Sequence, residues 1–396
     1  MKSLRELYRI GKGPSSSHTI GPENACRHFL SRHSDADRFE VILYGSLAKT
    51  GEGHGTDTVI KSVLPNAVVH MDAVTETPHP NTMDLFAYCQ DTLLARQRVY
   101  SVGGGAIRWD GEIVKESPDV YDLHTLTEIR AFCEAQGMHL YDYVFAKEGA
   151  EIRAYLGEVW QTMKAAVARG IARDGELPGG LHVERRAKIL YTSNAPEESA
   201  ETRENRLVCA YAFAVSEENA SGGTIVTAPT CGACGVLPAV LIHAQERWGY
   251  TDEQVIQSLA TAGLIGNLIK TNASISGAEC GCQAEIGSAC CMATAALSEL
   301  REMSLGQIEY SAEVAMEHHL GLTCDPICGL VQIPCIERNA VAAMRAINAS
   351  SLAYFLTNSR KISFDLVIQT MYETGKDLHR SYRETAEGGL AKLYKH

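Results

Sequence analysis

The pattern of hydrophobic and polar positions changes near residue 120. Before it, short runs rich in β-branched and aromatic residues, bounded by Gly, Pro or Asn, predict strands. These strands lie at 39–44, 67–71 and 99–102, and the spacing between them predicts helices over 21–33, 55–64 and 82–95. A hairpin is expected over 107–114, around Asp110-Gly111. The pattern indicates a small N-terminal α/β-type domain.

After residue 120 the strand signal fades and helical spacing takes over. Helices are expected over 122–136, 151–171, 203–216, 253–270, 283–301, 307–320, 337–357 and 364–379. A segment over 173–205, rich in Gly, Pro and charge, reads as a linker or wrapping loop. We therefore predict an α+β fold. It has an N-terminal domain over 1–145, a helix and linker over 146–202, and an all-α domain over 203–396.

Composition narrows the class of protein. Lys plus Arg number 36 and Asp plus Glu 48, a formal net charge of -12, which argues against a nucleic-acid or anionic-membrane binder. The sequence has no apolar run of about 18 residues and no signal-peptide pattern at its start. Thirteen cysteines, an odd number, suit a reduced, cytoplasmic protein better than a disulfide framework.

The cysteines are concentrated in one region. Nine of the thirteen fall between Cys231 and Cys335, several beside Gly, Pro or polar residues, and the other four are isolated and expected in cores. Thiolates select zinc, copper(I) or iron–sulfur clusters, although Cys is also an ordinary small core residue. Cys231-Gly-Ala-Cys234 has no nearby second pair, so a zinc ribbon is weakly supported. A cluster held by widely separated loops fits the spacing better.

Two loops in the N-terminal domain suggest a site. Gly13-Pro-Ser-Ser-Ser-His-Thr-Ile-Gly-Pro22 places several hydroxyls before a helix, where they could bind a carboxylate or simply cap the helix. His54 lies in the glycine-rich loop over 50–57. Histidine suits proton abstraction near neutral pH, although a histidine in such a loop is often only a solvated surface residue.

Five segments together resemble one family. The strings at 13–22, 270–279, 316–326, 334–339 and 371–377 are similar to those of the iron–sulfur-dependent L-serine dehydratases. The resemblance covers nearly the whole chain and implies a β domain followed by an all-α catalytic domain. It also implies an oxygen-sensitive 4Fe-4S cluster held by Cys282, Cys324 and Cys335. With three thiolates, one iron stays open and can act as a Lewis acid.

The resemblance further implies that L-serine loses water and is deaminated to pyruvate and ammonia. For the base we expect His54, with His18 as a reserve or relay partner. The substrate carboxylate or amine would be held by Ser15, Ser16, Ser17 and Thr19 in the N-terminal domain, with second-tier candidates Lys270, Asn272, Ser274 and Ser276. The site would then lie between the two domains.

Three other functions remain open. A pyridoxal-phosphate dehydratase would need Lys270 and Ser221-Gly-Gly223, and would leave the cysteine loops unexplained. An L-cysteine desulfidase could use the same fold, and a sensor or structural zinc protein would show no turnover. The stretch between Gly53 and Gly103 is shorter than in many relatives, and the chain ends in His396 without the cysteine that ends many of them. A homodimer is the default expectation.

Overall fold

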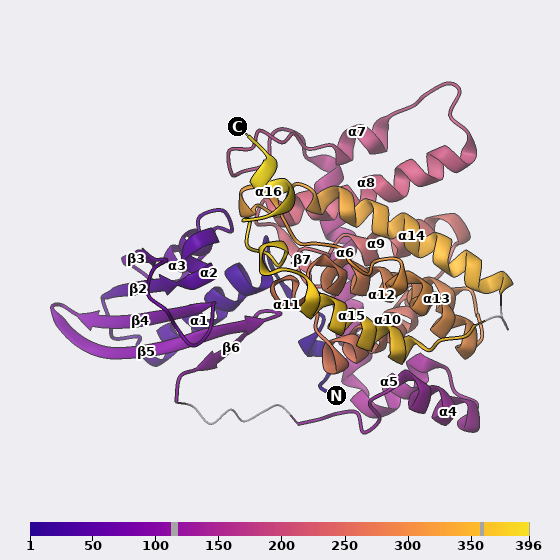
Figure 1. Cartoon of the computed structure of the whole chain (residues 1–396), viewed down its shortest axis with the longest axis horizontal. Helices are drawn as coiled ribbons and strands as arrows, with labels where there is room; N and C mark the ends of the chain where they lie inside the picture. The colour runs from indigo at the N-terminus through magenta and orange to yellow at the C-terminus, as the bar shows by residue number, and fades with distance from the viewer. Residues whose placement is uncertain (112–117, 357–359, 396) are drawn as a thin grey trace.

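The structure is a computed structural model that describes residues 1–111, 118–356 and 360–395. It contains two separate hydrophobic cores, one in a small sheet domain and one in a larger helical body. Figure 1 shows the sheet domain on the left and the helical body on the right. The predicted α+β class is confirmed. Within the described ranges, no helix is both long and apolar enough to cross a membrane.

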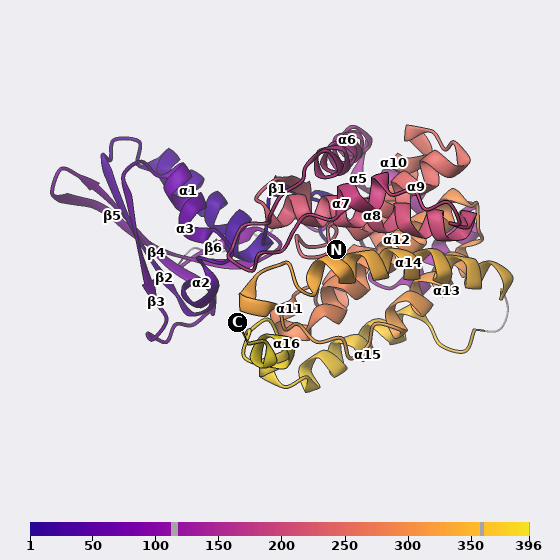
Figure 2. The ribbon, with the colours of Figure 1, turned by 90° about the horizontal axis from the view of Figure 1, so that it is seen from above.

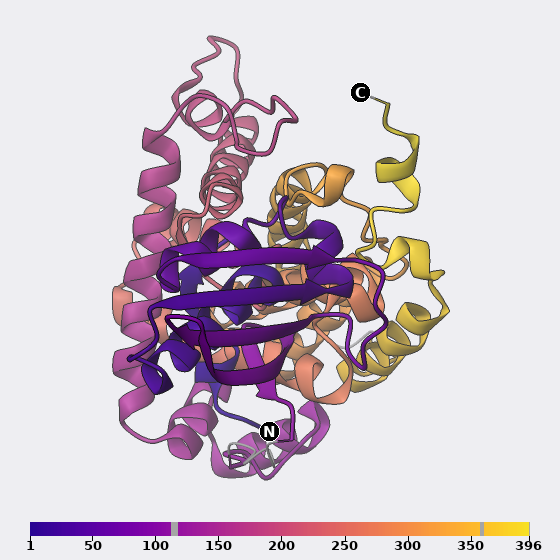
Figure 3. The ribbon, with the colours of Figure 1, turned by 90° about the vertical axis from the view of Figure 1, so that its left-hand side faces the viewer.

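The sheet domain is a five-stranded sheet in the order β3-β2-β4-β5-β6. Only the β2–β3 pair is parallel; the other pairs are antiparallel. Side chains on one face, such as Val41 and Leu85, are buried under α1 and α3. Figure 3 looks onto the strands with α1 behind them. The bounds are β2 Arg38–Tyr44, β3 Ala67–Asp72, β4 Thr82–Cys89, β5 Thr92–Gly103, β6 Ala106–Trp109, α1 Gly21–Arg32, α2 Gly45–Thr50 and α3 Thr56–Val63.

The helix predicted over 82–95 is wrong, because this segment forms β4 and the start of β5. Met83, Leu85 and Ala87 are buried at every second position, which is the period of a strand. Gln90, at φ 53°, turns the chain between the two strands. The hairpin expected over 107–114 is described only in part, with a strand followed by a turn at Asp110-Gly111. β6 pairs back onto β5 and ends at Trp109, and the hairpin's second arm falls outside the described residues.

The helical body is built around α12, whose 13 residues are all buried. It packs against α9, α10, α13 and α14, as Figure 2 shows from above. Small residues let these helices approach closely. Gly266 of α10 has no side chain, and a Cβ at this position would lie only 2.7 Å from the sulfur of Met292 on α12. The helices are α4 Leu126–Gln136, α5 Leu140–Glu148, α6 Glu151–Ala172, α7 Ala187–Thr192, α8 Ala200–Ala220, α9 Val236–Trp248, α10 Asp252–Asn272, α11 Gly277–Cys280, α12 Ser288–Leu300, α13 Leu305–Glu317, α14 Cys335–Phe355, α15 Phe364–Asp377 and α16 Gly389–Leu393.

The chain enters the helical body before it forms the sheet. Met1, Leu4 and Tyr8 belong to the helical core, and β1 (Ile10–Lys12) pairs with β7 (Thr224–Val226). The expected domain boundary at residue 145 falls inside α5, which packs on α10. The segment expected to be a linker over 173–205 contains α7 and the start of α8. The sheet domain is therefore inserted near the start of the chain, anchored at both ends.

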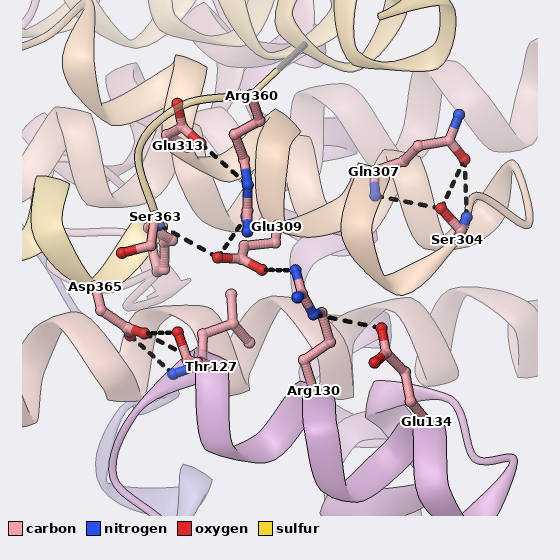
Figure 4. A network of polar contacts seen from close by, with 12 residues as sticks. Thr127, Arg130, Glu134, Ser304, Gln307, Glu309, Glu313, Arg360, Ser363 and Asp365 are labelled. Atoms are coloured by element: carbon pink, nitrogen blue, oxygen red, sulfur yellow. Dashed lines mark hydrogen bonds and ion pairs between the residues drawn. The ribbon is translucent and has the colours of Figure 1, made fainter. Parts of the chain in front are cut away.

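A buried carboxylate ties the outer helices together. Glu309 on α13 is 1% exposed, and its two oxygens lie 2.5 Å from Arg130 of α4 and 2.5 Å from Arg360 (Figure 4). Asp365, at the start of α15, accepts hydrogen bonds from the backbone and hydroxyl of Thr127. These contacts dock α4 against α13 and α15, so the periphery of the helical body is fixed by buried charge as well as by apolar packing.

Candidate active site

A cavity of about 250 Å³ lies where the sheet domain meets the helical body. Its wall on the N-terminal side includes His54 and residues 14–17 of the serine loop, which spans residues 13–19. The opposite wall comes from the loops that follow α10 and precede α14. The predicted site residues that line this cavity are Ser15, Ser16, Ser17, His54, Lys270, Ser274, Ser276, Cys282, Cys324 and Cys335.

The serine loop is held from both bodies. The backbone N–H of Gly13 donates to the Gly223 carbonyl at 3.1 Å, and the Asn219 amide donates to the Pro14 carbonyl at 3.0 Å. From the sheet, the Ser101 hydroxyl donates to the Ser17 carbonyl at 2.7 Å. The loop then runs through one π-helical turn, Ser16–Ile20, into α1. The hydroxyl groups therefore sit on a fixed backbone at the domain junction.

The two candidate histidines are both 2% exposed and are linked through their loops. The Thr19 hydroxyl donates to the His54 carbonyl, and the Thr56 hydroxyl donates to the His18 carbonyl. Burial lowers the pKa of His54 to about 4 and holds that of His18 well below its usual value. His54 Nδ1 is buried without a hydrogen-bond partner in the described part of the chain. His54 is therefore a buried, neutral imidazole in the cavity wall.

Three predicted residues, His18, Thr19 and Asn272, lie outside the cavity wall. His18 does not line the cavity; its Nδ1 lies 2.9 Å from the Ser17 Oγ and its Nε2 lies 3.0 Å from the Ser46 Oγ. Asn272 also lies outside the cavity wall, and its amide donates to the carbonyls of His124 and Leu268. The structure thus places Asn272 in the contact between α10 and the segment before α4, away from any substrate position.

The three cysteines expected to hold the cluster meet at the cavity wall. Cys282 and Cys324 are 3% exposed and Cys335 is 9% exposed, and all three are free thiols. Sulfur atoms of Cys282 and Cys324 and a carboxylate oxygen of Glu285 all lie within 4.8 Å of one another. The adjacent Cys282 thiol raises the pKa of Cys324, and burial raises the pKa of Cys335.

This donor set fits the proposed metal group. Several buried thiols close together do not ionise readily, because each thiolate would be desolvated and would repel the others. A soft metal centre stabilises the thiolates by binding where the protons were. The remaining cysteines of this half do not line the cavity. Cys290, for example, donates to the Ala342 carbonyl and packs in the core, whereas Cys328 is exposed. Of the four isolated cysteines, Cys89 is exposed, so the expectation that all four are core residues is wrong for it.

Four charged residues at the site were missing from the sequence prediction, and one of them, Glu279, lines the cavity and accepts a hydrogen bond from the Ser274 hydroxyl. Glu285 and Glu384 line the cavity, and burial raises the pKa of both, that of Glu384 to about 8. Arg338 lies one helical turn after Cys335 and interacts with the Cys282 and Cys335 thiols. Glu285 and Arg338 each follow an expected ligand by three residues, a spacing that places neighbours on one helical face. This spacing was the signal from which Glu285 and Arg338 could have been predicted. Nothing in the sequence pointed to Glu384.

Comparison with known proteins identifies the class to which this fold and site belong. The family model described as serine dehydratase alpha chain matches residues 59–391, and the one described as serine dehydratase beta chain matches residues 3–66. The chain therefore belongs to the serine dehydratase family, with both chain types joined in one polypeptide, as the resemblance predicted.

The alignments with relatives span nearly the whole of both proteins. The chain is 40% identical to an L-serine dehydratase of Haemophilus influenzae over 449 aligned positions that cover 99% of each protein. It is equally similar to L-serine dehydratase TdcG of Escherichia coli, again with 99% of both covered. An L-serine dehydratase of Streptomyces coelicolor is 40% identical, with 98% of each covered. The alignments are longer than this chain of 396 residues, so these relatives contain segments that it lacks.

Proposed function

We propose that this protein is an L-serine dehydratase that converts L-serine to pyruvate and ammonia with the help of a 4Fe-4S cluster. One observation carries the proposal. A single cavity brings the serine loop and a neutral buried histidine together with three free, buried cysteines. The names of the relatives support the reaction. The donor set supports the cofactor.

Cys282, Cys324 and Cys335 would hold the cluster. When bound by three thiolates, a 4Fe-4S cluster supplies one iron that can polarise a substrate oxygen as a Lewis acid. A pyridoxal-phosphate mechanism finds less support, because Ser221 and Gly223 do not line the cavity and Lys270 donates to the Glu6 carbonyl at 3.2 Å. Lys270 thus shares the cavity with the serine loop and not with Ser221 or Gly223.

The charges on the walls match a zwitterionic amino acid. The hydroxyls of Ser15 and Ser17 and the Lys270 ammonium would bind the substrate carboxylate. The carboxylates of Glu285 and Glu384 would face the substrate ammonium. With the carboxylate, the ammonium and the side chain of the amino acid each held in place, its single Cα hydrogen would point toward His54 in only one enantiomer, so the site would select L-serine.

His54 would then take the Cα proton on the ring nitrogen that faces the cavity. The low pKa of His54 keeps its imidazole neutral at neutral pH, so that one ring nitrogen is free to accept a proton, and the burial of the ring excludes competing water. Removal of the Cα proton and loss of the β-hydroxyl as water leave aminoacrylate. This tautomerises to the imine, which water hydrolyses to pyruvate and ammonia. His18, 4.6 Å from His54 between ring centroids, would position the loop and pass the proton onward through Ser46.

The test is a substrate panel with anaerobically purified, iron-loaded protein. Pyruvate should form from L-serine and not from D-serine, and removal of iron with a chelator should abolish the rate. Faster turnover of L-cysteine than of L-serine would replace the proposal with a desulfidase on the same site. Iron-loaded protein that turns over neither amino acid would overturn the proposed function and favour a sensor.

A further inference from the structure

Arg338 is the cation that connects the three cysteine loops. It lies on α14, which begins at Cys335, and its side chain is only 17% exposed. Its guanidinium donates to the Thr323 carbonyl at 2.6 Å and to the Asp325 carboxylate at 3.3 Å, and these residues flank Cys324 on either side. The same guanidinium interacts electrostatically with the thiols of Cys282 and Cys335. One side chain thus reaches all three segments that carry the expected ligands.

The charge around these thiols is unbalanced without Arg338. Glu285 and Glu384 face the cysteines from η3 (Gln283–Gly287) and from the segment before α16. Three thiolates add further negative charge when they are deprotonated. Lys270 is the cation in the cavity wall, and it donates to the Glu6 carbonyl away from the thiols. Arg338 also interacts with Glu285, so it offsets both the thiolates and the carboxylate.

The contacts suit arginine in particular. A planar guanidinium can donate to a carbonyl and a carboxylate at the same time, whereas a lysine ammonium acts as a point charge. Asp325, the acceptor, also accepts from the Thr323 hydroxyl at 3.0 Å and from the Leu390 backbone at 2.8 Å. Arg338 therefore fixes the loop that carries Cys324, and Asp325 links this loop to the start of α16.

We propose that Arg338 is a positioning residue for the iron–sulfur cluster, with two separable effects. Its hydrogen bonds hold the Cys324 loop in the geometry that ligates iron, and its positive charge favours the more reduced cluster. Both effects rest on the proposed function, because they require the cluster to be there. Charge and hydrogen bonds around the sulfur atoms are known determinants of cluster potential.

Two variants separate these effects. In Arg338→Lys the charge stays but the two-point hydrogen bonding is lost, so anaerobic iron release to a ferrous chelator should be about tenfold faster. The midpoint potential should stay near that of the unmodified protein. In Arg338→Met both the positive charge and the hydrogen bonds are lost. One-electron oxidation of the cluster, with ferricyanide as the electron acceptor, should therefore also become about tenfold more favourable. This corresponds to a midpoint potential about 59 mV lower than in the unmodified protein. Arg345→Met, two turns along the same helix, is the matched control and should change neither quantity.

The outcomes distinguish the two proposals. Unmodified protein that binds no iron and sulfide overturns the proposed cofactor and this inference together. Unmodified protein that holds the cluster, with Arg338→Met showing the same iron-release rate and potential, overturns this inference alone. If circular dichroism shows that Arg338→Met does not fold, the positioning role is tested by comparing iron release from Arg338→Lys with that from Arg345→Met. Equal iron-release rates in those two variants then contradict the positioning role.

Discussion

The rings of His18 and His54 lie 4.6 Å apart, centroid to centroid, and are tilted by 44°. Each residue's backbone carbonyl accepts a hydroxyl from the other's loop, through Thr56 and Thr19. These two hydrogen bonds join the loop that carries the serine hydroxyls directly to the loop that carries the candidate base. In the proposed mechanism the sheet domain therefore supplies both substrate-binding hydroxyls and the base.

Replacement of His54 by Gln tests its role as the base. We expect kcat/KM for L-serine to fall by about 10²- to 10⁴-fold, the usual contribution of a general base. Iron content should not change, because His54 is not among the cysteine ligands. His70→Gln, an exposed position on β3, is the control and should stay active. Near-normal turnover of His54→Gln would assign proton abstraction to another group.

The depressed pKa of His54 predicts a loss of stability in acid. The folded protein keeps His54 neutral to about pH 4, whereas the unfolded chain takes up a proton near pH 6.5. The unfolded state therefore binds more protons between these values, and stability falls as the pH drops through this window. His54 alone should contribute a loss of about 2 kcal/mol between pH 7 and pH 5.

Urea unfolding at pH 7 and pH 5 measures this loss. His54→Gln should show a smaller drop in the free energy of unfolding than the unmodified protein, by the same amount. His70→Gln should show the unmodified drop. If His54→Gln and the unmodified protein lose equal stability between the two pH values, the burial of a neutral His54 is contradicted.

Ser101→Ala tests the anchoring of the serine loop. Ser101 is fully buried and donates to the Ser17 carbonyl, so its removal leaves that carbonyl without its partner. A lost buried hydrogen bond of this kind costs about 1–3 kcal/mol. We expect KM for L-serine to rise roughly tenfold with little change in iron content. Ser62→Ala, which removes a hydroxyl bonded within α3, should leave KM unchanged.

Glu309 should be among the most sensitive positions for stability. Glu309→Gln leaves Arg130 and Arg360 without the buried charge between them (Figure 4), and breaking such a pair costs about 3–5 kcal/mol. Glu134→Gln removes only an exposed partner of Arg130 and should cost less than about 1 kcal/mol. Urea denaturation of both variants checks this difference, and equal costs would mean that the buried pairing contributes little.

The sequence predicted most of the helical body because long amphipathic or apolar segments carry a strong periodic signal. α6, α10, α14 and α15 each lie within two residues of their expected bounds. α9 was missed because nearly all its residues up to Ala244 are buried, which removes the polar face that reveals a helix. The β4 segment was misassigned as a helix because its alternation of apolar and polar residues is interrupted. Phe86 is apolar but lies on the face opposite to Leu85 and Ala87.

The candidate site was predictable only where a motif carried it. The serine loop and the three cysteines stood out as strings, and the structure brings them to one cavity. Glu384 and Arg338 are brought to the site by contacts between segments that lie far apart in the sequence. Glu384 reaches the site because its neighbour Arg383 forms a β-bridge with Cys324. Asn272 sits in a matching string, yet the end of α10 turns its amide toward His124. Such orientations depend on packing between distant segments.

The central claim is that a cluster held by Cys282, Cys324 and Cys335 serves serine dehydration. The most direct measurement is iron and sulfide content, together with pyruvate formation from L-serine, in anaerobic preparations of the unmodified protein and single Cys→Ser variants. Cys280→Ala, a buried thiol two residues before Cys282, is the matched control. We predict about four irons and four sulfides in active unmodified protein and in Cys280→Ala, with both cluster and activity lost in each of the three Cys→Ser variants. Iron-free protein that still forms pyruvate from L-serine would contradict the account.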